Sequence, residues 1–128
     1  MELEHTLAMQ IVGTILVIVA ILKNRDPIGM NKSIFGDVEG VEGGPAASMR
    51  MLIGGGFAGI GAINLYCSFN VDDAVAGEAI LLGTAIGLAM VFGTIVWARF
   101  RGYLEHIPTP PMVIFPTLIV ICLYSAMI

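Results

Sequence analysis

Residues 6–22 read TLAMQIVGTILVIVAIL, an uncharged apolar run that ends at Lys23. A helix needs roughly 20 apolar residues to cross the hydrocarbon core of a bilayer. Similar runs follow at residues 49–69, 77–97 and 111–128. They are continuous rather than alternating, and they are too long for buried strands. The sequence therefore predicts an all-α integral membrane protein, a four-helix bundle with helices near 6–22, 49–69, 77–97 and 111–128.

The composition agrees with a membrane location. Hydrophobic residues make up 57% of the 128-residue chain and charged residues 12%, whereas a soluble domain averages about 45–50% and about 25%. Six basic residues without a basic run exclude a nucleic-acid partner. The expected partners are the lipid bilayer and either further copies of the chain or other membrane subunits.

The basic residues predict the orientation of the helices. All of them lie beside the links that follow the first and third runs, at Lys23, Arg25, Lys32, Arg50, Arg99 and Arg101. Basic residues concentrate on the cytoplasmic side of membrane proteins. We expect one four-span domain over residues 1–128 in a bacterial inner membrane, with a cytoplasmic loop at 23–48 and both termini outside. The short outer link predicts a tight antiparallel hairpin of the second and third helices.

Glycines at helical spacing mark the second and third runs. Gly55 and Gly59 form a G-x-x-x-G pair, and Gly83 and Gly87 form another. Small residues let helix backbones approach closely in lipid. We expect these four glycines to pack the two helices together or to pack copies of the chain. The less favoured interpretation is a glycine groove that holds a ligand or a lipid tail.

Asn64 is a polar residue within the second run. An amide in hydrocarbon costs several kcal/mol unless it is hydrogen-bonded, so we expect a bond to a threonine of another helix. Thr84 and Thr94 are candidate partners, with Thr117 as a third. A second interpretation is that Asn64, Thr84 and Thr94 line a polar path for a neutral solute. No charged residue lies in the middle of a run, which argues against an ion-coupled transporter.

Four basic or titratable side chains form a candidate interface for lipid headgroups or a quinone at the expected cytoplasmic boundary: Arg50, Arg99, Arg101 and His106. His5 and His106 fall at opposite faces, roughly 30 Å apart, so they cannot share a metal ion. No metal site and no catalytic residue is predicted. A bound lipid or quinone is the one ligand that these residues suggest.

Part of the chain resembles small four-helix bacterial membrane families of unknown function that are related to DoxX-like proteins. In those families an arginine precedes a glycine-rich helix, and the third helix ends in a basic residue before a turn with glycine and proline. The matching residues here are Arg50, Gly54, Gly55, Gly56, Arg99, Gly102, Pro108 and Pro110. DoxX proteins are accessory membrane subunits linked to quinol or thiosulfate oxidation. The resemblance implies at most a redox-associated role, and it assigns no catalytic residue.

The sequence leaves three hypotheses for function. The first is a non-catalytic membrane protein that acts by helix packing, as a homo-oligomer or as an accessory subunit of a larger complex. The second is a small channel or carrier for a neutral or lipid-like solute. The third is a membrane redox subunit associated with a quinone or a lipid, which would act as an enzyme at the cytoplasmic interface. The first agrees best with the glycine faces and the uncharged helix interiors.

Overall fold

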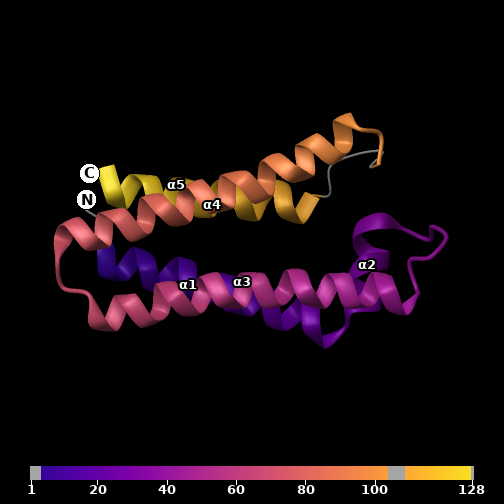
Figure 1. The fold of residues 1–128 in the computed structure, drawn as a ribbon, viewed down its shortest axis with the longest axis horizontal. Coiled ribbons are helices and arrows are strands. Elements are labelled where there is room, and N and C mark those ends of the chain that lie inside the picture. Colours follow the sequence, from indigo (N-terminus) through magenta and orange to yellow (C-terminus); the bar gives the residue numbers. More distant parts are fainter. Residues whose placement is uncertain (1–3, 104–108, 128) are drawn as a thin grey trace.

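The computed structural model describes residues 4–103 and 109–127, which form helices and links without a strand. The helices in this part of the chain are α1 (His5–Arg25), α2 (Pro27–Phe35), α3 (Gly44–Asn70), α4 (Ala74–Phe100) and α5 (Thr109–Met127). The start of α1, the α3–α4 link and the end of α5 share one end of the molecule (Figure 1). We call it the link end, and the opposite end is the α2 end. The all-α prediction is confirmed.

Three helices, α1, α3 and α4, are long and apolar enough to cross a membrane. Each of α3 and α4 contains 27 residues, which corresponds to about 40 Å at about 1.5 Å per residue. In α5 the apolar stretch Met112–Met127 is shorter than in the other three. The first three predicted spans therefore have the length and apolarity of a crossing. The fourth predicted run is helical but shorter.

The long helices pack as two pairs. α1 lies along α3, α4 lies along α5, and the contacts between the pairs are sparser (Figure 1). The buried positions of α3 recur every three or four residues, which is the spacing of left-handed helix packing. They are Arg50, Gly54, Phe57, Gly61, Asn64 and Ser68.

A short link of residues 71–73 joins α3 to α4, but the predicted tight packing of these two helices is wrong, because α3 packs mainly against α1. Gly13 of α1 and Gly61 of α3 face each other so closely that a Cβ on either would lie 2.8 Å from the other's carbonyl oxygen. This contact requires glycine on both helices.

The predicted glycine pairs lie elsewhere on the helices. A Cβ built on Gly55, Gly59, Gly83 or Gly87 meets no atom of the described residues within 4 Å. These glycines therefore do not pack α3 against α4 within the chain. A role in packing separate copies of the chain stays a prediction.

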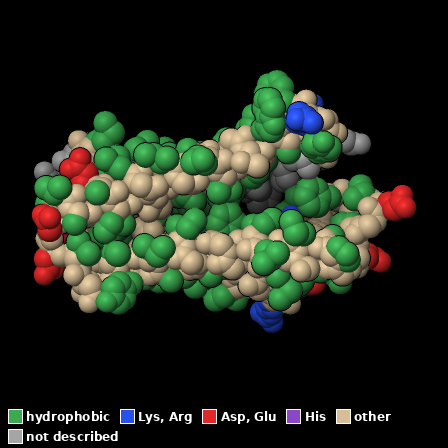
Figure 2. Space-filling view, in the orientation of Figure 1, with side chains coloured by type: hydrophobic (Ala, Val, Ile, Leu, Met, Phe, Trp, Pro, Cys, Tyr) green, Lys and Arg blue, Asp and Glu red, His purple; other side chains and the backbone are tan. Residues whose placement is uncertain are grey.

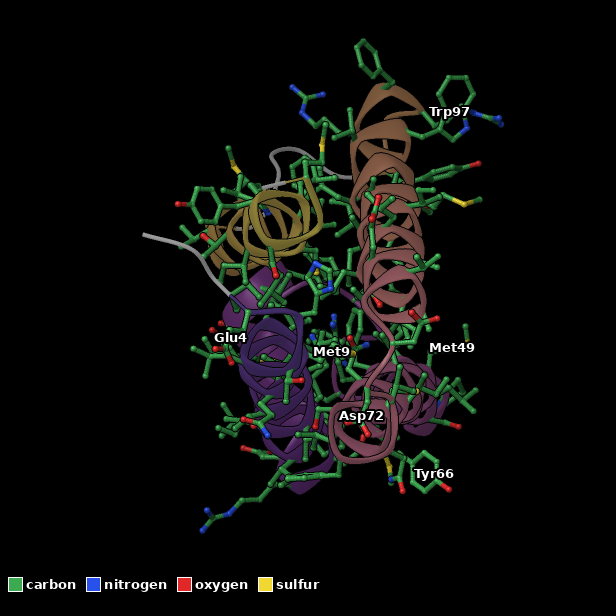
Figure 3. All side chains as sticks on the ribbon, turned by 90° about the vertical axis from the view of Figure 1, so that its left-hand side faces the viewer. Glu4, Met9, Met49, Tyr66, Asp72 and Trp97 are labelled. Atoms are coloured by element: carbon green, nitrogen blue, oxygen red, sulfur yellow. The ribbon has the colours of Figure 1, made fainter. Side chains whose placement is uncertain are left out.

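The core lies between the helices, and the outward faces carry large apolar side chains. In the end-on view of Figure 3, Met9 points between the helices, whereas Tyr66 and Trp97 point outward. Met9 is 1% exposed, while Tyr66 and Trp97 are 70% and 62% exposed. Apolar side chains also cover the long sides of the molecule in Figure 2. An apolar outer surface is what a helix surrounded by lipid tails presents.

The predicted loop at 23–48 contains a short helix that the sequence analysis did not assign. α1 continues to Arg25, and α2 begins at Pro27 after Asp26, whose side chain accepts a hydrogen bond from the Gly29 amide at 3.1 Å. α2 ends at Phe35, and the capping residue Gly36 has a φ of 75°, which favours glycine. Helix α2 packs against α3 and α1, so it places its side chains beside the α2 ends of both.

Candidate functional site

A cavity of about 570 Å³ opens at the α2 end, between the two helix pairs. Its size falls within the roughly 300–1,000 Å³ of small-molecule sites. Figure 2 shows the hollow between the upper and lower layers, toward the right of the view. Every helix lines it, through Lys23 of α1, Phe35 of α2, Arg50 and Phe57 of α3, Ile95 of α4 and Phe115 of α5.

Aromatic and aliphatic side chains form most of the cavity wall. The rings of Phe57 and Phe115 have centroids 5.4 Å apart at an interplanar angle of 44°. This contact joins α3 of one pair to α5 of the other. Phe92 of α4 packs beside it, with its centroid 6.4 Å from that of Phe115. Because Phe57 lies seven residues beyond Arg50, the aromatic contact is about 10 Å further along the helix axis.

Arg50 is held at the α2 end of the cavity by contacts with α2. Its Nε donates a hydrogen bond of 2.7 Å to Oδ1 of Asn31, and its guanidinium carbon lies 5.6 Å from the centroid of the Phe35 ring. Only 8% of Arg50 is exposed. The hydrogen bond fixes the orientation of the guanidinium group toward the cavity that it lines.

Lys23 brings a second cation to the same cavity. It is 8% exposed, and its Nζ lies 5.8 Å from the centroid of the Phe57 ring. A cation over an aromatic face gains about 0.5–1 kcal/mol when exposed and about 2 kcal/mol when desolvated. The cavity therefore has two cations at its α2 end and aromatic rings deeper between the helices.

The predicted headgroup or quinone interface is only partly assembled in the structure. Arg50 lines the cavity, whereas Arg99 and Arg101 are exposed. Arg101 lies over the ring of Tyr103, at 5.9 Å from its centroid, and Tyr103 lines the cavity. His106 lies outside the described residues.

Asn64 and Thr84 form a hydrogen-bonded contact between α3 and α4. Asn64 is fully buried, and its Nδ2 donates to Thr84 Oγ1 at 3.1 Å and to the Ile60 carbonyl oxygen at 3.0 Å. The Thr84 hydroxyl donates to the Ile80 carbonyl oxygen at 2.8 Å. Thr94 is not part of this contact, since its hydroxyl bonds within α4 and its residue lines the cavity.

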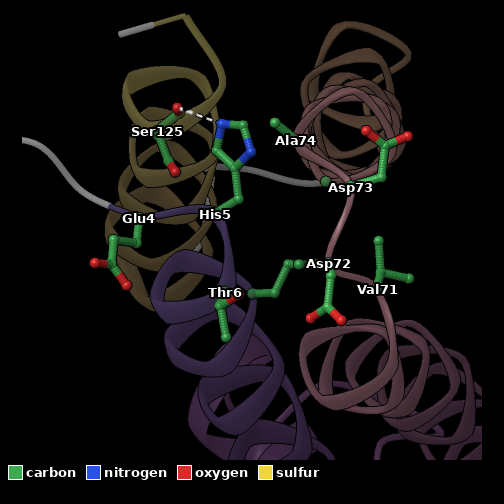
Figure 4. A pocket seen from close by; sticks show the side chains of 10 residues that line it. Glu4, His5, Thr6, Val71, Asp72, Asp73, Ala74 and Ser125 are labelled. Atoms are coloured by element: carbon green, nitrogen blue, oxygen red, sulfur yellow. Dashed lines mark hydrogen bonds between the residues drawn. The ribbon is translucent and has the colours of Figure 1, made fainter.

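A smaller pocket of about 280 Å³ at the link end gathers His5 and the carboxylates of Glu4, Asp72 and Asp73 (Figure 4). The carboxylates point apart in this view. His5 Nε2 donates to the Ser125 carbonyl oxygen at 3.1 Å, and Asp73 caps α4 by accepting from the Val75 amide. The described residues contain no group of three side chains that could hold a metal ion. Of these polar groups, His5 joins the start of α1 to the end of α5, and Asp73 caps α4.

The sequence pattern does not identify four of the residues around the cavity as site residues: Lys23, Asn31, Phe57 and Phe115. From the pattern, Lys23 only indicates the orientation of the first helix. One local signal for the site was available: Asp26 before Pro27 is a typical start of a helix. That signal predicts α2, and α2 places Asn31 beside Arg50.

The described chain is thus a helical protein with three helices fit to cross a membrane and an aromatic cavity between two helix pairs. Comparison with protein-family models, curated proteins and solved structures finds no match. The resemblance to DoxX-like families stays a prediction.

Proposed function

We propose that the protein is a non-catalytic integral membrane protein that binds a lipid or a quinone in the cavity between its helix pairs. The observation that carries this proposal is the cavity itself. It is about 570 Å³ in volume, and its wall combines aromatic rings with two cations. Such a wall suits an amphiphilic molecule, because one part of the wall is apolar and the other part is charged.

The proposal places the α2 end at the cytoplasmic face of a bacterial inner membrane, with both chain termini outside. The positions of the charges support this orientation. In Figure 2 the blue side chains lie toward the α2 end, and acidic side chains but no basic ones are seen at the link end. Basic residues are concentrated on the cytoplasmic side of membrane proteins. With this orientation α5 is the fourth crossing.

Filling the cavity tests the proposed function. Ala98 lines the cavity on α4, whereas Ala89 is exposed on the same helix and does not line it. We expect Ala98→Phe to reduce the lipid or quinone that co-purifies in mild detergent, and Ala89→Phe to leave it unchanged. Extraction followed by mass spectrometry measures both. Equal ligand content in the two variants would contradict binding in the cavity.

The second candidate function is helix packing between copies of the chain or with another membrane subunit. It is favoured by Gly55 and Gly59, which are exposed on α3 with no atom near the position of a Cβ. A helix face of this kind allows a second backbone to approach. Native mass spectrometry should show a defined oligomer that Gly59→Leu dissociates. A stable monomer at all protein concentrations would contradict this function.

A channel or carrier for a neutral solute has less support. Asn64 and Thr84 bond each other and nearby carbonyl oxygens, which leaves them little capacity to bind a passing solute. Solute flux into liposomes that is abolished by Asn64→Leu would support this function.

A further inference from the structure

Lys23 and Arg50 are two nearly buried cations for which the described residues supply no counter-charge. Within residues 4–103 and 109–127, the ion pair that the structure contains joins Lys32 to Glu42 at the surface. Arg50 bonds the neutral amide of Asn31, and both cations lie near aromatic rings. These contacts solvate the cations without neutralising them.

A nearly buried cation without a counter-charge is costly, because it has lost much of its hydration. Two such cations on one cavity wall also repel each other. An anion bound between the two cations offsets both their lost hydration and their mutual repulsion. As formed by the described residues, the cavity therefore favours a ligand with a negative group over a neutral one.

Asn31 adds an unused hydrogen-bond donor beside Arg50. It is 3% exposed, its Oδ1 accepts from Arg50, and its Nδ2 is buried without a hydrogen-bond partner among the described residues. Asn31 lines a second cavity of about 360 Å³ that shares Phe35 and Arg50 with the first. Exposed Glu39 of the loop also lines this second cavity. Asn31 does not line the first cavity, so Lys23 and Arg50 are the nearly buried donors that line it.

The depth of these groups fits a bilayer. Lys23 lies in the last turn of α1 and Arg50 lies in the second turn of α3, so both are at the α2 ends of spanning helices. Headgroup phosphates of lipids lie at this level, just outside the hydrocarbon core. Phe57 and Phe115 lie deeper, where an acyl chain would be.

We infer that the cavity binds an anionic phospholipid, with its headgroup phosphate between Lys23 and Arg50 and an acyl chain against Phe57 and Phe115. This inference rests on the proposed function and names its ligand. A phosphate accepts several hydrogen bonds from charged donors, which matches the side chains on the wall. The acyl chain gains by burial between the helix pairs.

Native mass spectrometry of the full chain tests the inference. Delipidated protein is titrated separately with phosphatidylglycerol, phosphatidylcholine and menaquinone. We expect phosphatidylglycerol to bind about tenfold or more tightly than phosphatidylcholine, because the second lipid has no net charge for the cations to recognise. Excess inorganic phosphate should not displace the bound lipid, since it lacks the acyl chain.

Matched variants show whether the two cations cause the preference. Lys23→Gln and Arg50→Gln should each weaken phosphatidylglycerol binding about tenfold. Arg25→Gln and Arg99→Gln remove exposed cations from the last turns of α1 and α4 and should leave phosphatidylglycerol binding unchanged. Arg50→Lys loses the bond to Asn31 but keeps the charge, so it should retain the preference for the anionic lipid. Circular dichroism verifies that each variant is folded.

The possible outcomes separate the two proposals. Equal affinity for the two phospholipids, or a preference that survives both Gln substitutions, would overturn the inference and leave cavity binding intact. Binding of menaquinone alone would do the same. Displacement of the lipid by inorganic phosphate would also overturn it, because a free anion would then be sufficient. Binding of none of the probes would overturn the proposed function.

Discussion

The contact between Gly13 and Gly61 predicts that Gly61→Ala weakens the packing of α1 against α3. The new Cβ would lie 2.8 Å from the Gly13 carbonyl oxygen and 2.9 Å from Cγ2 of Val17, whereas ordinary contact begins at 3.4 Å. Because the nearer atom belongs to the backbone, it cannot rotate away. The two helices must therefore separate locally by about 0.6 Å, which is the difference between the contact distances of 3.4 Å and 2.8 Å.

Gly59→Ala is the matched control for this prediction. It makes the same change two residues earlier on α3, where the new Cβ meets no atom within 4 Å. Alanine favours a helix over glycine by about 1 kcal/mol, and this gain cancels when the two variants are compared. Overpacking costs about 1–3 kcal/mol. We therefore expect Gly61→Ala to be about 1–3 kcal/mol less stable than Gly59→Ala.

Unfolding of the two variants in mixed micelles with increasing denaturing detergent, followed by circular dichroism, measures the difference. Protein dilute enough to be monomeric keeps packing between copies out of the comparison. If Gly61→Ala unfolds at the same detergent fraction as Gly59→Ala, the close α1–α3 contact is wrong. A larger loss for Gly59→Ala would instead locate the important glycine contact on the other face of α3.

Three further predictions concern single contacts. A double-mutant cycle of Asn64→Leu and Thr84→Val should give a coupling energy of about 0.6 kcal/mol, typical of hydrogen bonds between membrane helices; zero coupling would contradict the bond. Asp26→Ala should destabilise α2 by about 1 kcal/mol through loss of its cap, seen as faster amide exchange in α2 alone. Lys32 lowers the pKa of Glu42 by hydrogen bonding and by its charge, and Glu42 raises the pKa of Lys32. The pair should therefore survive acidification until the pH falls below the usual range of glutamate, and an NMR titration of Glu42 with an ordinary midpoint would refute it.

Much of the helical architecture could be predicted from the sequence because apolar runs of spanning length have few alternatives. Which helices pack against each other could not be predicted. Gly55 and Gly59 form the motif that usually indicates packing, yet Gly61 makes the close contact within the chain. All three glycines lie on α3, but Gly61 lies on a different face of the helix from Gly55 and Gly59. A single chain does not reveal which face meets α1.

Of the residues predicted from the sequence, Arg50 and Thr94 line the cavity, and only Arg50 was predicted as part of a ligand interface. A cation at the end of an apolar run is typical of residues that set the orientation in the membrane and of residues that contact lipid headgroups. Both exposed Arg99 and buried Arg50 fit this pattern. Lys23 becomes part of a site because α1 packs on α3 and brings it to Phe57. Phe115 enters only when α5 meets α3 across the pairs. These are long-range contacts, and no local periodicity encodes them.

The most direct test of a lipid held by two cations is a distance measurement in the bilayer. Solid-state NMR on protein in phosphatidylglycerol membranes can detect dipolar coupling between lipid phosphorus and labelled side-chain nitrogen atoms. The account predicts strong coupling to the nitrogen atoms of Lys23 and Arg50, and weaker coupling to exposed Arg25 and Arg99. Coupling that is equal at all four residues, or absent from Lys23 and Arg50, would contradict it.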